Sequence, residues 1–165
     1  MPTLEDALIL AATAHMGQKD RADLPYILHP LNVMMSLDLS DEKALIVAVL
    51  HDAVEDTCVT LDYLRDKGYS EEIVGAIEAL TKKVAPKAAG TGFYDAMGTE
   101  KYSHFIRRVK ANPLATKVKI ADLQHNADLG RLTQVESYDL KRLDRYNRAL
   151  QYLTGRFPSP DILID

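Results

Sequence analysis

Apolar residues along this chain recur mostly at the spacing of one helical face. In the first segment Leu4, Leu8 and His15 fall on one stripe, and Thr3 with the acid three residues later has the spacing of a capping box. A first helix is therefore predicted over 4–16. Similar stripes and N-cap residues predict further helices at 29–37, from Asp41 through the stretch 44–56, and at 60–67, 70–83, 99–111, 113–129 and 137–154.

The chain lacks the other common pattern, a strict alternation of apolar and polar residues flanked by tight turns, which predicts strands. We therefore expect an all-α fold, a helical bundle in a single domain over 1–155 with a C-terminal tail at 156–165. Residues 84–98 contain three glycines and a proline and have no sustained period. A loop of this length inside a compact domain is usually functional or disordered.

Composition excludes several classes of function. The net charge is −4 and cations alternate with acids, so no cationic face is expected for a polymeric nucleic acid. The single cysteine, Cys58, cannot form an intramolecular disulfide and suits a reducing compartment. The N-terminus is acidic where a signal peptide is basic, and no apolar run reaches the ~18 residues of a membrane span. We expect a cytoplasmic protein without a membrane partner, whose state as monomer or homo-oligomer stays open.

Ionisable residues directly follow the apolar segment 44–50. On one continuous helix, the spacing of His51, Asp52, Glu55 and Asp56 would form two adjacent columns that face one cavity. Burying such groups is costly unless something pairs with them. Imidazole and carboxylate together are ligands for a divalent cation such as Mn²⁺, Fe²⁺ or Zn²⁺, whose charge would offset that cost.

Two further polar residues stand in apolar surroundings. His29 precedes Pro30 at a helix start, and Asp122 lies within the apolar stretch VKIADL. An unpaired carboxylate is unfavourable in such a stretch. Together with His51 and Asp52, these two residues would make one mixed nitrogen and oxygen site from three helices, with positions open to water and substrate.

Three motifs, in order, closely resemble those of the HD-domain phosphohydrolases of the RelA/SpoT type, which include small stand-alone alarmone hydrolases. They are PYILHP at 25–30, HDAVEDT at 51–57 and VKIADLQHN at 118–126, within a similarity that spans roughly residues 5–153. The resemblance implies an all-α HD-domain bundle, in agreement with the helical pattern. It also implies a metal-dependent hydrolase that removes pyrophosphate from the 3′ position of guanosine tetraphosphate (ppGpp) or pentaphosphate.

The resemblance further implies a role for individual residues. The implied metal ligands are His29, His51, Asp52 and Asp122, the implied catalytic residues are Glu55 and Asp56, and the implied substrate-binding residues are Lys19, Arg21 and Asn126. The family metal is usually Mn²⁺. A carboxylate near such a metal can orient or deprotonate the attacking water.

Two acidic residues depart from the family pattern and leave the substrate open. Asp20 stands where the family has an adjacent Arg and Lys, and Asp128 stands where the family has a further cation. Both weaken the attraction for a heavily phosphorylated ligand, although Lys82, Lys83 and Lys87 at the edge of the 84–98 loop could compensate. The alternatives are hydrolysis of another phosphorylated nucleotide, such as NADPH or a 3′-phosphonucleotide, and a nucleotide-binding module without turnover.

Other histidines and a tyrosine have simpler expected roles. His15 is expected to pack or hydrogen-bond beside the site and not to ligate a metal. His104 and His125 are expected at the surface or behind the ligands, and Tyr146 in the core with room to line a pocket.

Overall fold

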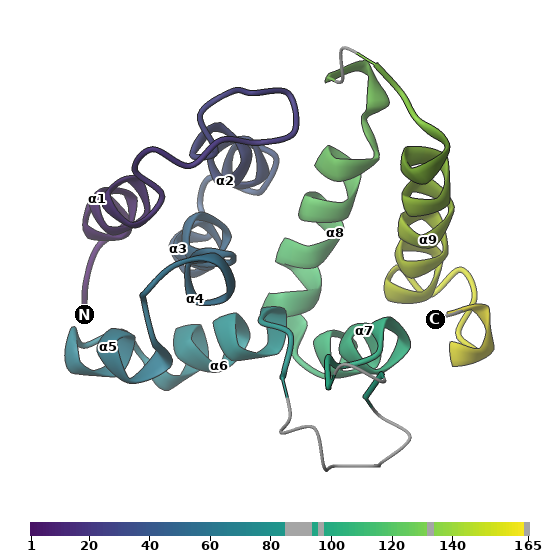
Figure 1. The fold of residues 1–165 in the computed structure, drawn as a ribbon. Helices are drawn as coiled ribbons and strands as arrows, with labels where there is room; N and C mark the ends of the chain where they lie inside the picture. The colour runs from purple at the N-terminus through teal and green to yellow at the C-terminus, as the bar shows by residue number, and fades with distance from the viewer. Residues whose placement is uncertain (85–93, 96–97, 132–133, 164–165) are drawn as a thin grey trace.

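The computed structural model describes residues 1–84, 94–95, 98–131 and 134–163, which form the all-α fold that the sequence predicts (Figure 1). Strand-type pairing in these ranges is confined to isolated bridges, which join Lys19 to Pro25, Val84 to Thr99 and Tyr94 to Glu100. The helices are α1 (Leu4–Ala14), α2 (Leu28–Met35), α3 (Glu42–Leu50), α4 (Ala53–Asp56), α5 (Leu61–Asp66), α6 (Glu71–Leu80), α7 (Tyr102–Lys110), α8 (Pro113–Ala127) and α9 (Ser137–Leu153), with short 3-10 turns η1 (Leu129–Arg131) and η2 (Pro160–Ile162).

Side-chain caps set the starts of several helices. Thr3 forms the predicted capping box of α1, and Asp41, Thr60 and Ser70 each accept a hydrogen bond from a backbone N–H in the first turn of α3, α5 and α6. Asn112 caps α8 in the same way, before a proline in its first turn. Such caps satisfy backbone donors that a helix leaves unpaired, so the starts can be predicted from sequence.

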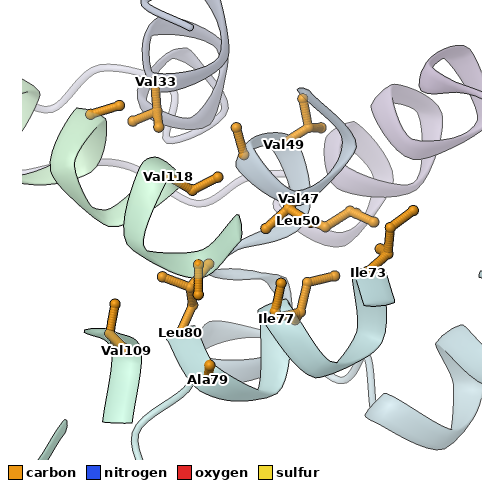
Figure 2. Packing of buried hydrophobic residues seen from close by; sticks show 14 of the residues in the cluster. Val33, Val47, Val49, Leu50, Ile73, Ile77, Ala79, Leu80, Val109 and Val118 are labelled. Atoms are coloured by element: carbon orange, nitrogen blue, oxygen red, sulfur yellow. The ribbon is translucent and has the colours of Figure 1, made fainter. Parts of the chain in front are cut away.

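Helix α3 is the centre of the core. Every residue from Ala44 to Leu50 is buried, and the helix packs against α1, α2, α6 and α8. Figure 2 shows Val47 and Leu50 of α3 in the apolar cluster with Ile77 of α6 and Val118 of α8. Burying each such aliphatic side chain stabilises the fold by about 1.5–3 kcal/mol. The C-terminal end of α3 is therefore held within the buried core.

Helix α8 separates the two halves of the bundle. It packs against α2 and α3 on one side and against α9 on the other, while α6 and α7 contact it near one end (Figure 1). The chain beyond α9 returns to the bundle, because η2 contacts α9 and Leu163 is buried against the core. Within the described ranges, no helix is long and apolar enough to cross a membrane.

The prediction of one continuous helix through His51 and Asp56 is wrong. Helix α3 ends at Leu50, His51 and Asp52 form a turn, and α4 begins at Ala53. The imidazole of His51 explains the break, since its Nδ1 lies 2.7 Å from the carbonyl oxygen of Ala48 and hydrogen-bonds to it. That carbonyl would otherwise accept the backbone N–H of Asp52 in the next helical turn. The predicted loop at 84–98 falls largely outside the described residues, as does Lys87.

Candidate active site

The four predicted metal ligands converge from three parts of the fold. His29 lies in the first turn of α2, His51 and Asp52 lie between α3 and α4, and Asp122 lies on α8. His29 Nε2 is 3.1 Å from Asp122 Oδ1 and 3.5 Å from Asp52 Oδ2. His51 Nε2 is 2.9 Å from Asp52 Oδ2 and 3.7 Å from Asp122 Oδ1. Ligand atoms of His29, His51 and Asp122 all lie within 4.8 Å of one another, and these three residues are buried.

Each imidazole is oriented through its second nitrogen. His51 Nδ1 is occupied by the Ala48 carbonyl, and His29 Nδ1 shares a hydrogen bond of 2.8 Å with Nδ1 of His125. Both Nε2 atoms therefore face the carboxylates. Metal-binding histidines are usually held in this way, because a hydrogen bond at one ring nitrogen sets the orientation of the other. His125 thus lies behind a candidate ligand, as the sequence predicts.

Neighbouring side chains also hold the two carboxylates. Tyr26 Oη donates a hydrogen bond of 2.5 Å to Asp52 Oδ2. Lys119 Nζ donates to Asp122 Oδ2 at 2.7 Å, and Asn126 Nδ2 donates to Asp122 Oδ1 at 2.5 Å. Asn126, which the resemblance implies as a substrate-binding residue, here contacts a candidate metal ligand.

Electrostatic interactions shift the pKa values of these groups strongly. Burial lowers the pKa of His51, but Asp52 and Asp122 outweigh it and raise that pKa to about 10. Burial also lowers the pKa of His29, but contacts with Asp122 and Asp52 outweigh burial and raise it. Against the effect of burial, Lys119 and both imidazoles hold the pKa of Asp122 well below its usual range. The cluster therefore has a negative field that stabilises positive charge.

These donors fit a divalent cation. In the described residues, the buried Nε2 of His51 has no hydrogen bond of acceptable geometry, although Asp52 Oδ2 lies 2.9 Å away. A buried nitrogen that lies among carboxylate oxygens and a second imidazole without a well-formed hydrogen bond is suited to a metal. Two imidazole nitrogens and two carboxylate oxygens are a ligand set for Mn²⁺, Fe²⁺ or Zn²⁺.

The two predicted catalytic carboxylates lie in different surroundings. Glu55 lines the cavity beside the metal ligands, and its Oε2 accepts the backbone N–H of Lys82 at 2.9 Å. Asp56 is exposed and absent from the described residues that line this cavity. Its pKa is raised by partial burial and by the charge of Asp52. Of the two residues predicted to project into the cavity, the structure brings only Glu55 there.

The cavity itself has a volume of about 460 Å³, which suits a nucleotide-sized ligand. The substrate-binding residues implied by the resemblance, Lys19, Arg21 and Asn126, all line it. Lys19 forms an ion pair of 2.8 Å with Asp23. Arg21 forms an ion pair with the buried carboxylate of Asp139 at the start of α9, which joins two distant segments of the chain that both line the cavity.

The two acids that depart from the family pattern also line the cavity. Asp20 Oδ1 accepts the backbone N–H groups of Ala22 and Leu24, and Asp128 Oδ1 accepts the N–H of Gly130. Each carboxylate therefore holds its own loop in shape while it adds negative charge to the cavity wall. Of the lysines proposed to compensate, Lys82 lines the cavity, whereas Lys83 forms an ion pair of 3.4 Å with Glu78.

Several cavity residues escaped the sequence analysis. Lys119 and Tyr26 had a signal, because both lie within the motifs that carry the family resemblance. Arg142 and Arg145 of α9 had no signal of their own, although Tyr146 of the same helix was expected to have room to line a pocket. Tyr146, expected in the core with room to line a pocket, does line it, and its Oη accepts hydrogen bonds of 2.5 and 2.9 Å from Arg142.

Comparisons with known proteins agree with this picture. The chain is 30% identical over 125 residues to guanosine-3′,5′-bis(diphosphate) 3′-pyrophosphohydrolase of Aquifex aeolicus. The aligned region covers 74% of this chain and 17% of that protein. The chain is also 31% identical over 140 residues to GTP pyrophosphokinase of Streptomyces coelicolor, in an alignment that covers 84% of this chain and 16% of that protein. The chain thus spans about a sixth of the length of these relatives. No family model matches the chain.

A solved structure has the same fold. It is described as a metazoan ortholog of SpoT that hydrolyses ppGpp, and it aligns with a TM-score of 0.71 and 22% identity over 94% of this chain and 88% of its own. Together with the sequence relatives, this likeness confirms the resemblance that the three motifs indicate. The chain is an HD-domain protein of the RelA/SpoT type.

Proposed function

We propose that this protein is a divalent-metal-dependent phosphohydrolase that cleaves ppGpp to GDP and pyrophosphate. The observation that carries the proposal is the convergence of His29, His51, Asp52 and Asp122 beside a nucleotide-sized cavity. The Aquifex aeolicus relative is a ppGpp 3′-pyrophosphohydrolase and the SpoT ortholog hydrolyses ppGpp, which supports the choice of substrate. We further propose Mn²⁺ as the metal and the cytoplasm as the location.

The proposed metal site uses the four converging residues. His29, His51, Asp52 and Asp122 would hold the cation, which when bound supplies positive charge to phosphate oxygens and makes water more acidic. Tyr26, Lys119 and His125 support these ligands through the hydrogen bonds described above. Loss of such supporting contacts commonly weakens metal binding by about 10- to 100-fold.

The reaction requires a proton acceptor near the attacking water. The water oxygen bonds to the phosphorus that carries the 3′ ester, the bond between this phosphorus and the 3′ oxygen breaks, and the 3′ oxygen gains a proton as pyrophosphate leaves. Glu55 would accept the proton that water loses, because it lines the cavity and its carboxylate is held by the N–H of Lys82. Asp56, one residue further along α4, does not line the cavity and would act on this water only indirectly, through its charge beside Asp52.

A second candidate function follows from the acids in the cavity wall. Asp20 and Asp128 lower the attraction for a ligand with two diphosphate groups, and both line the cavity. A nucleotide with less charge, such as NADPH or a 3′-phosphonucleotide, would meet less repulsion. The reaction would be the same, with orthophosphate in place of pyrophosphate as the product.

A hydrolysis panel tests the proposal. The purified protein with Mn²⁺ is incubated with ppGpp, NADPH and a 3′-phosphonucleotide, and both pyrophosphate and orthophosphate are measured. Release of pyrophosphate from ppGpp, lost in Asp122→Ala, is the expected result. Turnover of NADPH or the 3′-phosphonucleotide without turnover of ppGpp would refute the choice of substrate, and no turnover of any of them would favour a binding module.

A further inference from the structure

A cluster of cations and aromatic rings forms one wall of the cavity. The Nζ of Lys82 lies 5.6 Å from the ring centre of Tyr102 and 5.9 Å from that of Phe105. The guanidinium of Arg145 lies 4.8 Å from the same Tyr102 ring, and Lys119 Nζ lies 5.1 Å from the Phe105 ring. All five residues line the cavity. Three cavity-lining cations thus gather around two adjacent rings, and Arg108, outside the cavity lining, lies 5.5 Å from the centre of the Phe105 ring.

Two of these cations have no carboxylate partner in the part of the chain that the structure describes. Lys119 pairs with Asp122, but neither Lys82 Nζ nor the guanidinium of Arg145 forms an ion pair with a described residue. Burial lowers the pKa of Lys82, and the nearby charges of Arg145 and Lys119 lower it further against the opposing charges of Glu55 and Glu100. Positive charge crowded in this way is costly, and an anion between the groups would relieve the cost.

Two buried polar atoms in the same cluster also lack hydrogen bonds. They are the hydroxyl of Tyr102 and Nε of Arg145, neither of which has a partner among the described residues. Burial raises the pKa of Tyr102 to about 12, so its hydroxyl stays protonated and can donate. Buried donors are normally satisfied in folded proteins, and exceptions of this kind often mark a ligand site. Both unsatisfied atoms are donors, which is what a phosphate oxygen needs.

The cluster adjoins the reaction centre on two sides. Lys119 contacts Asp122, a candidate metal ligand, and the backbone N–H of Lys82 holds Glu55, the candidate base. An anion in the cluster would therefore belong to a group close to the phosphorus under attack. In a diphosphate ester, the terminal phosphate is one bridging oxygen away from that phosphorus.

We infer that Lys82, Arg145 and Tyr102 form a subsite for the terminal phosphate of the diphosphate group that is released. The inference rests on the proposed function, and it makes the cavity selective for diphosphate esters over monophosphate esters. A guanidinium can donate two parallel hydrogen bonds to a phosphate, and an ammonium adds a second positive charge. A monophosphate ester would leave both cations and the tyrosine hydroxyl unpaired.

Binding of inorganic pyrophosphate tests the subsite without any nucleotide. Calorimetric titrations of chelator-treated protein compare pyrophosphate with orthophosphate in the wild type, Lys82→Met and Arg145→Met. Methionine keeps an unbranched apolar stem over the aromatic rings and removes the charge. We expect the wild type to favour pyrophosphate, and each variant to lose about ten-fold or more in pyrophosphate affinity with little change for orthophosphate, as for loss of one charge-assisted contact.

Matched controls come from the neighbouring positions. Lys83 pairs with Glu78, and Arg148 pairs with Asp144 at 2.8 Å on α9; neither cation lines the cavity. Lys83→Met and Arg148→Met should bind pyrophosphate as the wild type does. Tyr102→Phe removes one donor while keeping the ring, and a smaller loss of pyrophosphate affinity is expected.

The outcomes separate the subsite from the hydrolase activity. Pyrophosphate binding that depends on Lys82 and Arg145 supports the subsite even if no nucleotide is hydrolysed, in which case only the proposed function fails. Wild-type pyrophosphate affinity in both folded variants refutes the subsite. Unchanged kcat/KM for ppGpp in both variants of an active enzyme would also refute it, while the hydrolase assignment would stand.

Discussion

Arg108 of α7 links the end of α6 to the loop that follows. Its guanidinium donates hydrogen bonds to both carboxylate oxygens of Glu100, at 2.6 and 3.1 Å. It also donates to the carbonyl oxygens of Glu78, Ala79 and Thr81, at 2.8–2.9 Å. The side chain of Glu100 is only 8% exposed. We predict that Arg108→Met destabilises the protein strongly, because it leaves a buried carboxylate and three helix-end carbonyls without this donor.

The size of the effect follows from this geometry. Removing one partner of a buried ion pair costs about 3–5 kcal/mol. Glu100 keeps one hydrogen bond, from the backbone N–H of Lys83 at 3.1 Å, and the Arg108 side chain is 24% exposed. We therefore expect the lower end of that range, about 3 kcal/mol of unfolding free energy. In a domain of this size the melting temperature should fall by about 6–12 °C.

Thermal and urea unfolding followed by circular dichroism measure the effect. Arg107→Met is the matched control, because Arg107 is the preceding residue on α7 and is exposed. Its unfolding free energy should change by less than about 0.5 kcal/mol, as is usual for a surface position. A loss in Arg108→Met as small as in the control would show that the Arg108 contacts do not hold the end of α6.

Three further predictions concern the metal, the base and pH. Asp122→Ala should lower the bound Mn²⁺ per chain measured by elemental analysis and abolish hydrolysis; an unchanged stoichiometry would remove Asp122 from the ligands. Glu55→Gln should keep fold and metal content while turnover falls by roughly 10² to 10⁴, the scale of a lost general base, with a smaller loss in Asp56→Asn; a near wild-type rate would place the base elsewhere. Burial raises the pKa of Glu100, but the hydrogen bonds from Arg108 and Lys83 outweigh burial and lower that pKa. The ionised Glu100 therefore stabilises the folded protein above its unfolded pKa of about 4.3, and this stabilisation is lost as pH falls through the folded pKa. Melting temperatures between neutral and acidic pH should therefore fall less in Glu100→Gln than in the wild type, and parallel curves would contradict this.

Local signals explain what the sequence predicts well. The starts of α1, α3, α5 and α6 follow from single capping residues such as Thr3 and Ser70, whose hydrogen bonds stay within one helical turn. The break between α3 and α4 does not follow, because the helical period continues through it. It depends on the hydrogen bond between the His51 side chain and the Ala48 carbonyl, and the orientation of that side chain depends on the surrounding core.

The residues of the candidate site also fall into those that local sequence predicts and those that it does not. His29, His51 and Asp122 stand out because each is polar in an apolar stretch, so each carries its own signal. Arg145 is an ordinary surface residue by pattern, and Lys82 stands out only as one of several lysines at the edge of a loop. The place of both in the cavity depends on how α6 and α9 pack against α7 and α8. That packing is a property of the whole bundle, which no local window of sequence contains.

The ion pair between Arg21 and Asp139 has a consequence for the order of folding. It joins residues 118 positions apart, from the loop after α1 to the first turn of α9. Contacts of such long sequence separation form late, because the intervening chain loses entropy when its ends meet. We expect the cavity to be assembled after the core around α3, only when both ends of the chain have docked. Pulsed hydrogen exchange during refolding should then protect α3 before the first turn of α9, and the reverse order would show that the cavity walls meet first.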